Sequence, residues 1–521
     1  MRALTKSRLF LLASLVLAVL VFLKNAWVAE DAYIIFRTIE QLFVGNGLVW
    51  NPHERVQVYT SPLWCLVLVF ARVFSSDQYL NVIVVSFCFW LLTVFVLKKL
   101  FIKSHLLFVS IMLLSASSSF FDFTSSGLEN VLGYCVIAAY ILGYSKVFAF
   151  EVSQERLAFL VKMVLFLFGL IICVRHDLGV LLFPSVVYLF LKNRRVLSLH
   201  QWIKFGFLAL LPFVTYTLVS LFYYGFPFPN TAYAKLNTGI DKLDILRQGA
   251  SYFYATLEND VITLLMIFLA LIVTFLRASG VHHKYLACGV VLDLIYIAYI
   301  GGDFMQGRFF SYAYFVSIIL LLLAFSETDE TKVQYPFIAL VFLYVTYYPN
   351  TPFNTSINYS DRSIKNGIAN ERAFYFNKLS LISYVLYDTE NKLFPSHIWA
   401  REGYEFKIDD SVLIVETGTI GMFGYFSGTE KIIVDTLALS DPLLARIPVT
   451  GGWRIGHFKR AIPPGYYESL AYDSEVIVDP ELNEFYTKLK ILTQSDDLFS
   501  WERLKTIVMF NVGAYNYLLE K

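Results

Sequence analysis

The sequence predicts a polytopic α-helical membrane protein of about eleven spans that carries a soluble α/β domain at its C-terminus. Mean hydropathy is +0.59, and 16% of the residues are charged, against roughly 25% in an average soluble domain. Apolar stretches long enough to cross a bilayer recur as far as residue 348 and then stop. We therefore assign residues 1–348 to a transmembrane module and residues 349–521 to the soluble domain.

The predicted spans are apolar windows that match a hydrocarbon layer of about 30 Å. They cover residues 9–28, 79–97, 103–120, 128–147, 158–174, 177–191, 203–223, 261–276, 285–300, 308–325 and 333–348. The stretch from Pro62 to Phe74 is apolar but short, so we interpret it as a helix that lies in the interface or re-enters the membrane.

The charges between the windows predict the orientation. If the N-terminus is cytoplasmic, the inner connections hold most of the cations, namely Lys98, Lys99, Lys103, Arg156, Lys192, Arg194, Arg195, Arg277 and Lys284. The short outer connections hold single cations, Arg175 and Arg308. This asymmetry follows the positive-inside rule. An odd number of spans then places residues from about 349 onward on the outer face.

The C-terminal residues have the pattern of an α/β domain. Ser411–Val415 and Lys431–Asp435 are typical of strands, and the Gly-rich stretch Thr417–Gly424 between them could begin a helix. This stretch has no G-x-G-x-x-G pattern, so a nucleotide site is not expected there.

Composition excludes several other classes. A net charge of +1 provides no basic excess to hold a nucleic-acid backbone, so we expect no nucleic-acid partner. The five cysteines lie in or beside apolar stretches without metal-ligand spacing, which argues against structural zinc and against a disulfide framework.

The outer connections hold most of the residues that packing alone does not explain. Glu30 and Asp31 are adjacent carboxylates at the mouth of the first span, which indicates either a site or a headgroup-layer pair neutralised by Arg37. Further polar residues lie in the other outer connections, at 121–130, 175–177, 224–260 and 301–308. Carboxylates and cations thus converge on one membrane face, and a phosphate partner needs such cations, arginine above all.

Taken in order, these motifs resemble a known family. The first loop contains Glu30-Asp31-Ala32-Tyr33 and Tyr59-Thr60-Ser61-Pro62, and it is followed by Asn230–Lys235 and Gly301–Arg308. The C-terminal part adds Asp435–Pro442, Trp453–Phe458 and Pro463–Tyr466. This set resembles the bacterial GT-C arabinofuranosyltransferases, which modify cell-wall arabinan or, in a related branch, pilin subunits. The family's first loop often begins with two aspartates, where this chain has Glu30-Asp31.

The resemblance implies a GT-C fold in the bacterial inner membrane, with the active site and the C-terminal domain outside. It implies a polyprenyl-phosphoryl-arabinose donor and a glycan or pilin-like protein acceptor. Asp31 is then the expected catalytic carboxylate, with Glu30 in support. The expected binding residues for the donor phosphate and sugar are Arg175, His176, Lys235, Asp303, Arg308, Tyr59 and Tyr233. We expect no further cofactor and no metal ion.

Alternatives stay open for residues and for function. Arg175 could simply pair with Asp177, Asp303 with Arg308, and both tyrosines could be interface anchors. Adjacent carboxylates do not reveal whether transfer inverts or retains configuration. The rival functions are a GT-C transferase of mannose or aminoarabinose, a lipid or sugar transporter, and a non-catalytic assembly protein. Transporters place charges inside their spans, where this sequence has chiefly Asp293.

Overall fold

The computed structural model of the protein describes residues 2–101, 103–149, 153–236, 238–277, 280–327, 331–356, 360–387, 393–472 and 476–519. The chain forms two compact units. Unit 1 contains Met1–Ala29, Phe74–Phe213 and Lys242–Leu386; unit 2 contains Glu30–Val73, Val214–Asp241 and Tyr387–Lys521. The predicted boundary at residue 348 follows the order of the chain, whereas this division follows contacts, so two interior segments join the C-terminal residues in unit 2.

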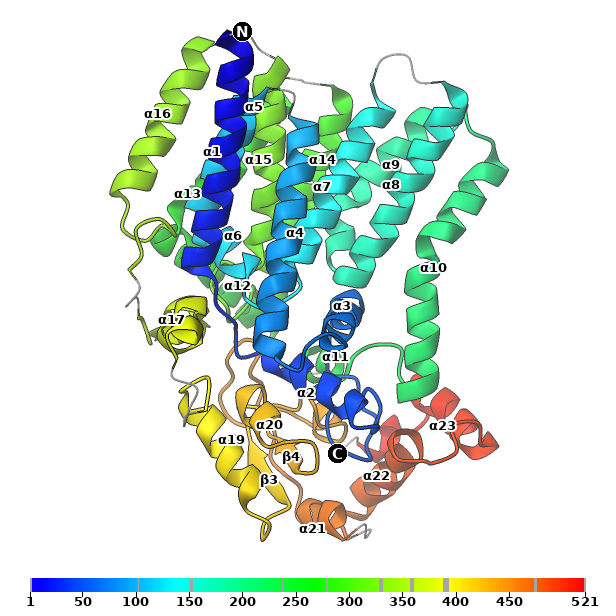
Figure 1. Cartoon of the computed structure of the whole chain (residues 1–521). Coiled ribbons are helices and arrows are strands. Elements are labelled where there is room, and N and C mark those ends of the chain that lie inside the picture. The colour runs from blue at the N-terminus through cyan, green and yellow to red at the C-terminus, as the bar shows by residue number, and fades with distance from the viewer. Residues whose placement is uncertain are drawn as a thin grey trace. The chain divides into compact units, whose positions relative to one another are not determined.

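Unit 1 is built mainly from long apolar helices (Figure 1). They are α1 (Arg2–Asn25), α4 (Gln78–Leu100), α5 (Ser104–Ala116), α6 (Ser118–Phe121), α7 (Asn130–Val147), α8 (Gln154–Val174), α9 (Leu178–Asn193), α12 (Lys242–Asn259), α13 (Val261–Arg277), α14 (Val281–Ile300), α15 (Phe310–Glu327) and α16 (Thr331–Tyr347). The helix α10 (Leu199–Tyr224) runs from unit 1 into unit 2.

Every predicted window overlaps one of these helices. Among the described residues, six helices are long and apolar enough to cross a membrane, or up to eight if each of two sharply bent helix pairs is one span. The bent pairs are α5 with the α6 segment, at 89°, and α12 with α13, at 106°. The chain therefore has the helices of a multi-pass membrane protein. The total of eleven stays a prediction, because α9, α15 and α16 are shorter apolar helices.

Close helix crossings and aromatic stacking hold unit 1 together. A methyl group at Gly289 on α14 would lie 1.8 Å from the carbonyl oxygen of Leu181 on α9, so this crossing requires glycine. At the centre of the unit, Phe120 stacks on Tyr134 with ring centroids 4.2 Å apart and on Phe315 at 5.6 Å. The buried faces of α5, α7 and α15 thus form its core.

Residues 349–386 belong to unit 1, although the sequence predicts them in the soluble domain. They form the strand pair β1 (Ile364–Lys365) and β2 (Ile368–Ala369) and the helices α17 (Glu371–Leu379) and α18 (Leu381–Val385). Trp27, just beyond α1, is fully buried beside them and bridges to Ser380. Its indole N–H donates to the Asp122 carbonyl at 2.7 Å. These contacts explain the assignment to unit 1.

Unit 2 combines short helices with two parallel strands. Its elements are α2 (Ala32–Phe43), α3 (Pro62–Arg72), α11 (Asn230–Leu236), α19 (Ile398–Ile408), β3 (Ile414–Thr417), α20 (Met422–Phe426), β4 (Ile432–Asp435), α21 (Tyr466–Ala471), α22 (Pro480–Thr493) and α23 (Trp501–Asn511). β3 pairs with β4 in parallel, with Ile414 opposite Ile432. The α/β pattern predicted for residues 411–435 is therefore confirmed, and α20 begins inside the Gly-rich stretch.

The first loop and the C-terminal residues share one apolar core. Ile34 on α2, together with Trp50, Val56 and Val58, packs against Ile420, Phe423 and Ile433. The side chain of Arg37 is buried with them and donates to backbone carbonyls of Trp50 at 2.8 Å, Gly428 at 2.6 Å and Lys431 at 2.7 Å, and also of Gly424. The alternative that Arg37 neutralises the Glu30–Asp31 pair is wrong, since carbonyls use its N–H groups.

A second buried arginine fixes the last turn of α10. Arg503 on α23 is fully buried, and its guanidinium donates to the carbonyls of Phe222 at 2.8 Å and Tyr223 at 2.9 Å. It also donates to Leu492 and Leu498, each at 3.2 Å. The last carbonyls of a helix have no partner within it, so a cation there satisfies them and complements the helix dipole.

Replacing Arg503 with Met should therefore lower the stability of unit 2 by at least about 3 kcal/mol, because several buried carbonyls lose their donor. We expect a lower midpoint of thermal unfolding and faster proteolysis of the C-terminal residues. Arg401→Met, at an exposed position on α19, is the control and should unfold as the wild type does. Equal midpoints for both variants would contradict the capping role of Arg503.

Candidate functional site

Unit 1 gathers charges from three connections that the sequence predicts on the outer face into one cluster, which we call the arginine cluster: Glu129, Arg175, Asp177, Asp303 and Arg308. Arg175 and Asp177 lie between α8 and α9, and their side chains form two hydrogen bonds of 3.0 and 2.5 Å. Arg308 precedes α15 and lies 3.0 Å from Glu129 and 3.6 Å from Asp303. Glu129 also lies 3.5 Å from Arg175, so it bridges the two arginines.

The cluster is mostly buried yet reachable. The arginine side chains are 11% and 12% exposed, and Glu129 is 4% exposed. Three carboxylates face two guanidinium groups, so both cations are already paired in this structure. Glu129 is the carboxylate that both arginines share.

The loop from Gly301 to Arg308 is held rigidly by Tyr252. The Tyr252 hydroxyl donates to the Met305 carbonyl at 3.0 Å and accepts from the Phe309 amide at 3.1 Å. A methyl group at Gly302 would lie 2.4 Å from the Tyr252 ring, and the φ of Gly302 is +71°. Glycine is thus required where this loop meets the tyrosine.

Of the residues predicted from sequence, Arg175, Asp303 and Arg308 come together in unit 1. His176 lies next to Arg175 in the chain, and its ring packs edge-on against Phe213 at 5.4 Å. Glu129 lies in the predicted outer connection at 121–130 but is not among the site residues that the sequence predicts. The signal that could have found it is charge balance, since two buried arginines need acidic partners.

Unit 2 contains the two predicted catalytic carboxylates, in different surroundings. Glu30 is buried and accepts the backbone N–H of Met422 at 3.0 Å. Asp31 is partly exposed and directly precedes α2. A methyl group at Gly421 would lie 2.2 Å from the Glu30 carbonyl oxygen, so glycine is required at this contact.

Burial and the neighbouring Asp31 charge raise the pKa of Glu30 from 4.5 to about 8, although hydrogen bonds from the 421–422 backbone oppose the shift. At neutral pH Glu30 therefore holds a proton for most of the time. The more exposed Asp31 is the better placed of the two to carry the negative charge and to meet a substrate.

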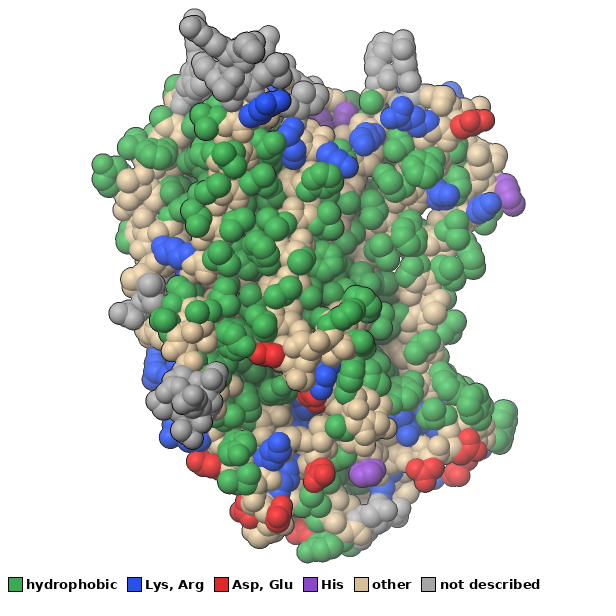
Figure 2. All heavy atoms as spheres, viewed as in Figure 1, with side chains coloured by type: hydrophobic (Ala, Val, Ile, Leu, Met, Phe, Trp, Pro, Cys, Tyr) green, Lys and Arg blue, Asp and Glu red, His purple; other side chains and the backbone are tan. Residues whose placement is uncertain are grey.

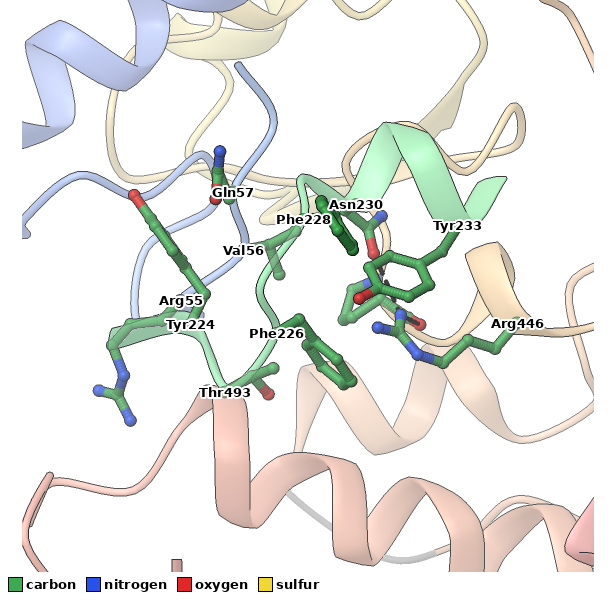
Figure 3. Close-up of a pocket in the computed structure, with 11 residues that line it drawn as sticks. Arg55, Val56, Gln57, Tyr224, Phe226, Phe228, Asn230, Tyr233, Arg446 and Thr493 are labelled. Atoms are coloured by element: carbon green, nitrogen blue, oxygen red, sulfur yellow. Dashed lines mark hydrogen bonds between the residues drawn. The ribbon is translucent and has the colours of Figure 1, made fainter. Parts of the chain in front are cut away.

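The remaining predicted residues of unit 2 have separate surroundings. Tyr59 is buried, and its hydroxyl lies 3.1 Å from that of Tyr224. Lys235 is exposed near the end of α11. Tyr233 contributes to a shallow pocket of about 240 Å³ of empty space, part of it open to solvent (Figure 3). Its ring lies 4.8 Å from the Arg446 guanidinium, which also covers Phe226 at 4.0 Å.

Asn230 positions this pocket. Its side-chain amide donates to the carbonyls of Ala438 at 3.0 Å, Leu439 at 3.2 Å and Asp441 at 2.9 Å, and its oxygen accepts from Arg446 at 3.1 Å. Two motifs far apart in the sequence, Asn230–Lys235 and Asp435–Pro442, are thereby joined. Among the described residues, no group of three or more His, Cys, Asp or Glu side chains is arranged so that it could hold a metal ion.

The comparisons with known proteins match a short segment. No family model matches the chain. Over 45 residues it is 47% identical to the terminal beta-(1->2)-arabinofuranosyltransferase of Corynebacterium glutamicum and 42% identical to that of Mycobacterium tuberculosis. These segments are 8% and 9% of this chain and 7% of each relative's length. The predicted resemblance to arabinofuranosyltransferases is confirmed for this segment.

Two solved structures are similar over more of the chain. ArnT from Cupriavidus metallidurans bound to undecaprenyl phosphate is 13% identical, with a TM-score of 0.47, 84% of this chain covered and 76% of that chain. The Archaeoglobus fulgidus oligosaccharyltransferase tethered with an acceptor peptide is 11% identical, with a TM-score of 0.44, 82% and 64% covered. With both scores below 0.5, these likenesses carry no argument here.

The buried Glu30 carboxyl should make the stability of unit 2 depend on pH. The folded chain keeps a proton on Glu30 that the unfolded chain loses between about pH 4.5 and 8, so stability should fall as the pH rises through this window. Glu30→Gln should remove up to about 1.4 kcal/mol per pH unit of that slope.

Thermal unfolding between pH 5 and 8 measures this effect. The midpoint of the wild type should fall relative to that of Glu30→Gln, while Glu484→Gln, at an exposed position on α22, should follow the wild type. A difference between wild type and Glu30→Gln that is the same at every pH would show that Glu30 does not hold this proton.

Proposed function

We propose that the chain is a glycosyltransferase that moves D-arabinofuranose from a polyprenyl-phosphate donor to a hydroxyl of a glycan or protein acceptor. The single observation that carries the chemistry is the unequal carboxylate pair, in which Asp31 is accessible and Glu30 is buried. The match to enzymes named terminal beta-(1->2)-arabinofuranosyltransferase supports the choice of sugar.

Asp31 acts on the acceptor in this proposal. It takes the proton of the acceptor hydroxyl while that oxygen bonds to the anomeric carbon of arabinose. The bond from that carbon to the phosphate oxygen breaks, and the lipid phosphate leaves with the electron pair. A positioned general base contributes roughly 10²–10⁴-fold to such a step.

Arg175 and Arg308 hold the phosphate of the donor in this proposal. Arginine binds phosphate through two parallel N–H donors, and these bonds strengthen as charge develops on the leaving group. The phosphate takes the position of Glu129 between the two guanidinium groups. Their two positive charges serve the departing phosphate, so we propose no metal ion and no further cofactor.

We also propose that the protein lies in the bacterial inner membrane with its site on the outer face. The support is the charge pattern of unit 1. Figure 2 shows Lys and Arg side chains gathered at the end of the helix bundle where α1 begins, which corresponds to the predicted inner connections. The arginine cluster belongs to connections predicted on the opposite side.

Purified protein incubated with labelled polyprenyl-phosphoryl-arabinose and an arabinan acceptor should release lipid phosphate and label the acceptor. Asp31→Asn keeps the size of the side chain but removes the base, so turnover should fall at least about 10²-fold while donor binding persists. Glu40→Gln, on the same segment, is the control. Near-normal turnover in Asp31→Asn would move the base to another carboxylate.

Arg308→Lys tests the phosphate contact. Lysine keeps the charge but lacks the planar fork, so the Kd for polyprenyl phosphate should rise about tenfold, which corresponds to about 1.4 kcal/mol. The matched control is Arg247→Lys, since Arg247 is 70% exposed and paired with Asp244. Unchanged affinity in a folded Arg308→Lys protein would exclude this arginine from the phosphate site.

A further inference from the structure

The helix α23 has two unlike faces. Arg503, Thr506 and Ile507 are buried. On another face, Trp501 is 79% exposed, Val508 59% and Val512, just past the helix, 70%. Their spacing of seven and four residues places them on one side of a helix. Phe499, which precedes α23, is 74% exposed and lengthens this apolar surface. We call Phe499, Trp501, Val508 and Val512 the α23 face.

Unit 2 ties this helix to the last turn of α10. Besides the two carbonyls that Arg503 caps, Asn511 on α23 donates to the carbonyl of Gly225 at 2.9 Å. The rings of Phe222 and Phe499 lie 5.0 Å apart. Gly225 ends α10 with a φ of +83°, and its amide donates to the Leu221 carbonyl at 3.1 Å. The α23 face is thus fixed beside a helix terminus.

The helix that ends there has the composition of a membrane span. α10 has 26 residues with a mean hydropathy of 1.9, and most of it is unburied. In its unit 2 part, Leu218 and Val219 are 60% and 58% exposed. The last turn of a span lies at the level of the lipid headgroups, so anything fixed to that turn lies there as well.

From this placement we infer that the α23 face inserts into the headgroup and upper acyl region of the bilayer, as an interfacial contact of unit 2. Tryptophan, with an apolar ring and a polar N–H, is the side chain best suited to that layer, and Trp501 is 79% exposed on this face. The inference is independent of the proposed transferase activity, and it depends on α10 crossing the membrane.

The charges around the α23 face indicate how it is held. Asp496, Asp497 and Glu502 are exposed nearby, whereas Lys505 is the exposed cation of the helix and Arg503 is buried. Figure 2 shows acidic side chains beside the hydrophobic ones in this region. Attraction to anionic lipid therefore does not drive the contact. It rests on apolar area and should form in a bilayer of neutral phosphatidylcholine.

Spin labels in the full chain test the contact. Val512→Cys is compared with Val478→Cys, a valine of unit 2 that is 72% exposed and lies before α22. Both variants carry Cys88→Ser and Cys288→Ser, since the other cysteines are buried. The labelled proteins are placed in phosphatidylcholine nanodiscs, and collisions with oxygen and with a water-soluble nickel chelate are measured.

We expect the label at 512 to collide more with oxygen and at least about threefold less with the chelate than the label at 478, as in an apolar layer. Equal access of the chelate to both positions would overturn the inference. Shielding of position 512 from both reagents would also overturn it, because a protein partner or a second copy would then cover the face. If Val512→Cys does not fold, Val508→Cys replaces it with the same expected outcomes.

Discussion

Buried charge must be compensated inside the protein, and the two units of this chain do so in opposite ways. In unit 1 the arginines of the cluster are paired with acids, and Glu129 serves two of them. In unit 2 the most buried arginines donate to backbone carbonyls instead. Arg37 binds the segment around α20, and Arg503 binds the end of α10. Each unit is held together at these points.

The pairing of these unit 2 arginines with backbone carbonyls affects the pKa values of the buried carboxyl groups in the unit. Because carbonyls occupy these arginines, the buried carboxyls of the unit have few cations near them. Burial raises the pKa of Glu54 to about 8, further raised by the Asp441 charge, and that of Asp441 to about 7. Asp441 accepts the hydroxyl of Tyr466 at 3.0 Å and the backbone N–H of Leu444 at 2.8 Å. Glu30 thus shares its raised pKa with other buried carboxyls of unit 2, so a raised pKa alone does not identify a catalytic residue.

The sequence was sufficient to predict features that repeat locally. Each apolar window that hydropathy predicts overlaps a helix of the structure. The pattern of residues 411–435 predicted the ends of β3 and β4 to within three residues. The sequence also predicted Arg175, Asp303 and Arg308 together as binding residues, because each lies next to a predicted span. What it could not reveal were contacts across hundreds of residues. Three of the four carbonyl partners of Arg37 lie at 424–431, and nothing near Arg37 in the sequence points to them.

The same limit explains the difference between the predicted domains and the compact units. Gly421 leaves room for Glu30, and the Met422 amide binds its carboxylate, so the first loop cannot adopt its fold without the C-terminal residues. Asn230 likewise connects an interior segment to the C-terminal residues, because its side-chain amide donates to the carbonyls of Ala438 and Asp441. Most motifs that carry the family resemblance thus lie in one unit, although they are spread over more than 400 positions, whereas Gly301–Arg308 belongs to the other. A motif set distributed in this way constrains both units at once. The proposed chemistry needs both an acidic loop that is shaped by the C-terminal residues and arginines that are positioned by the apolar helices of unit 1.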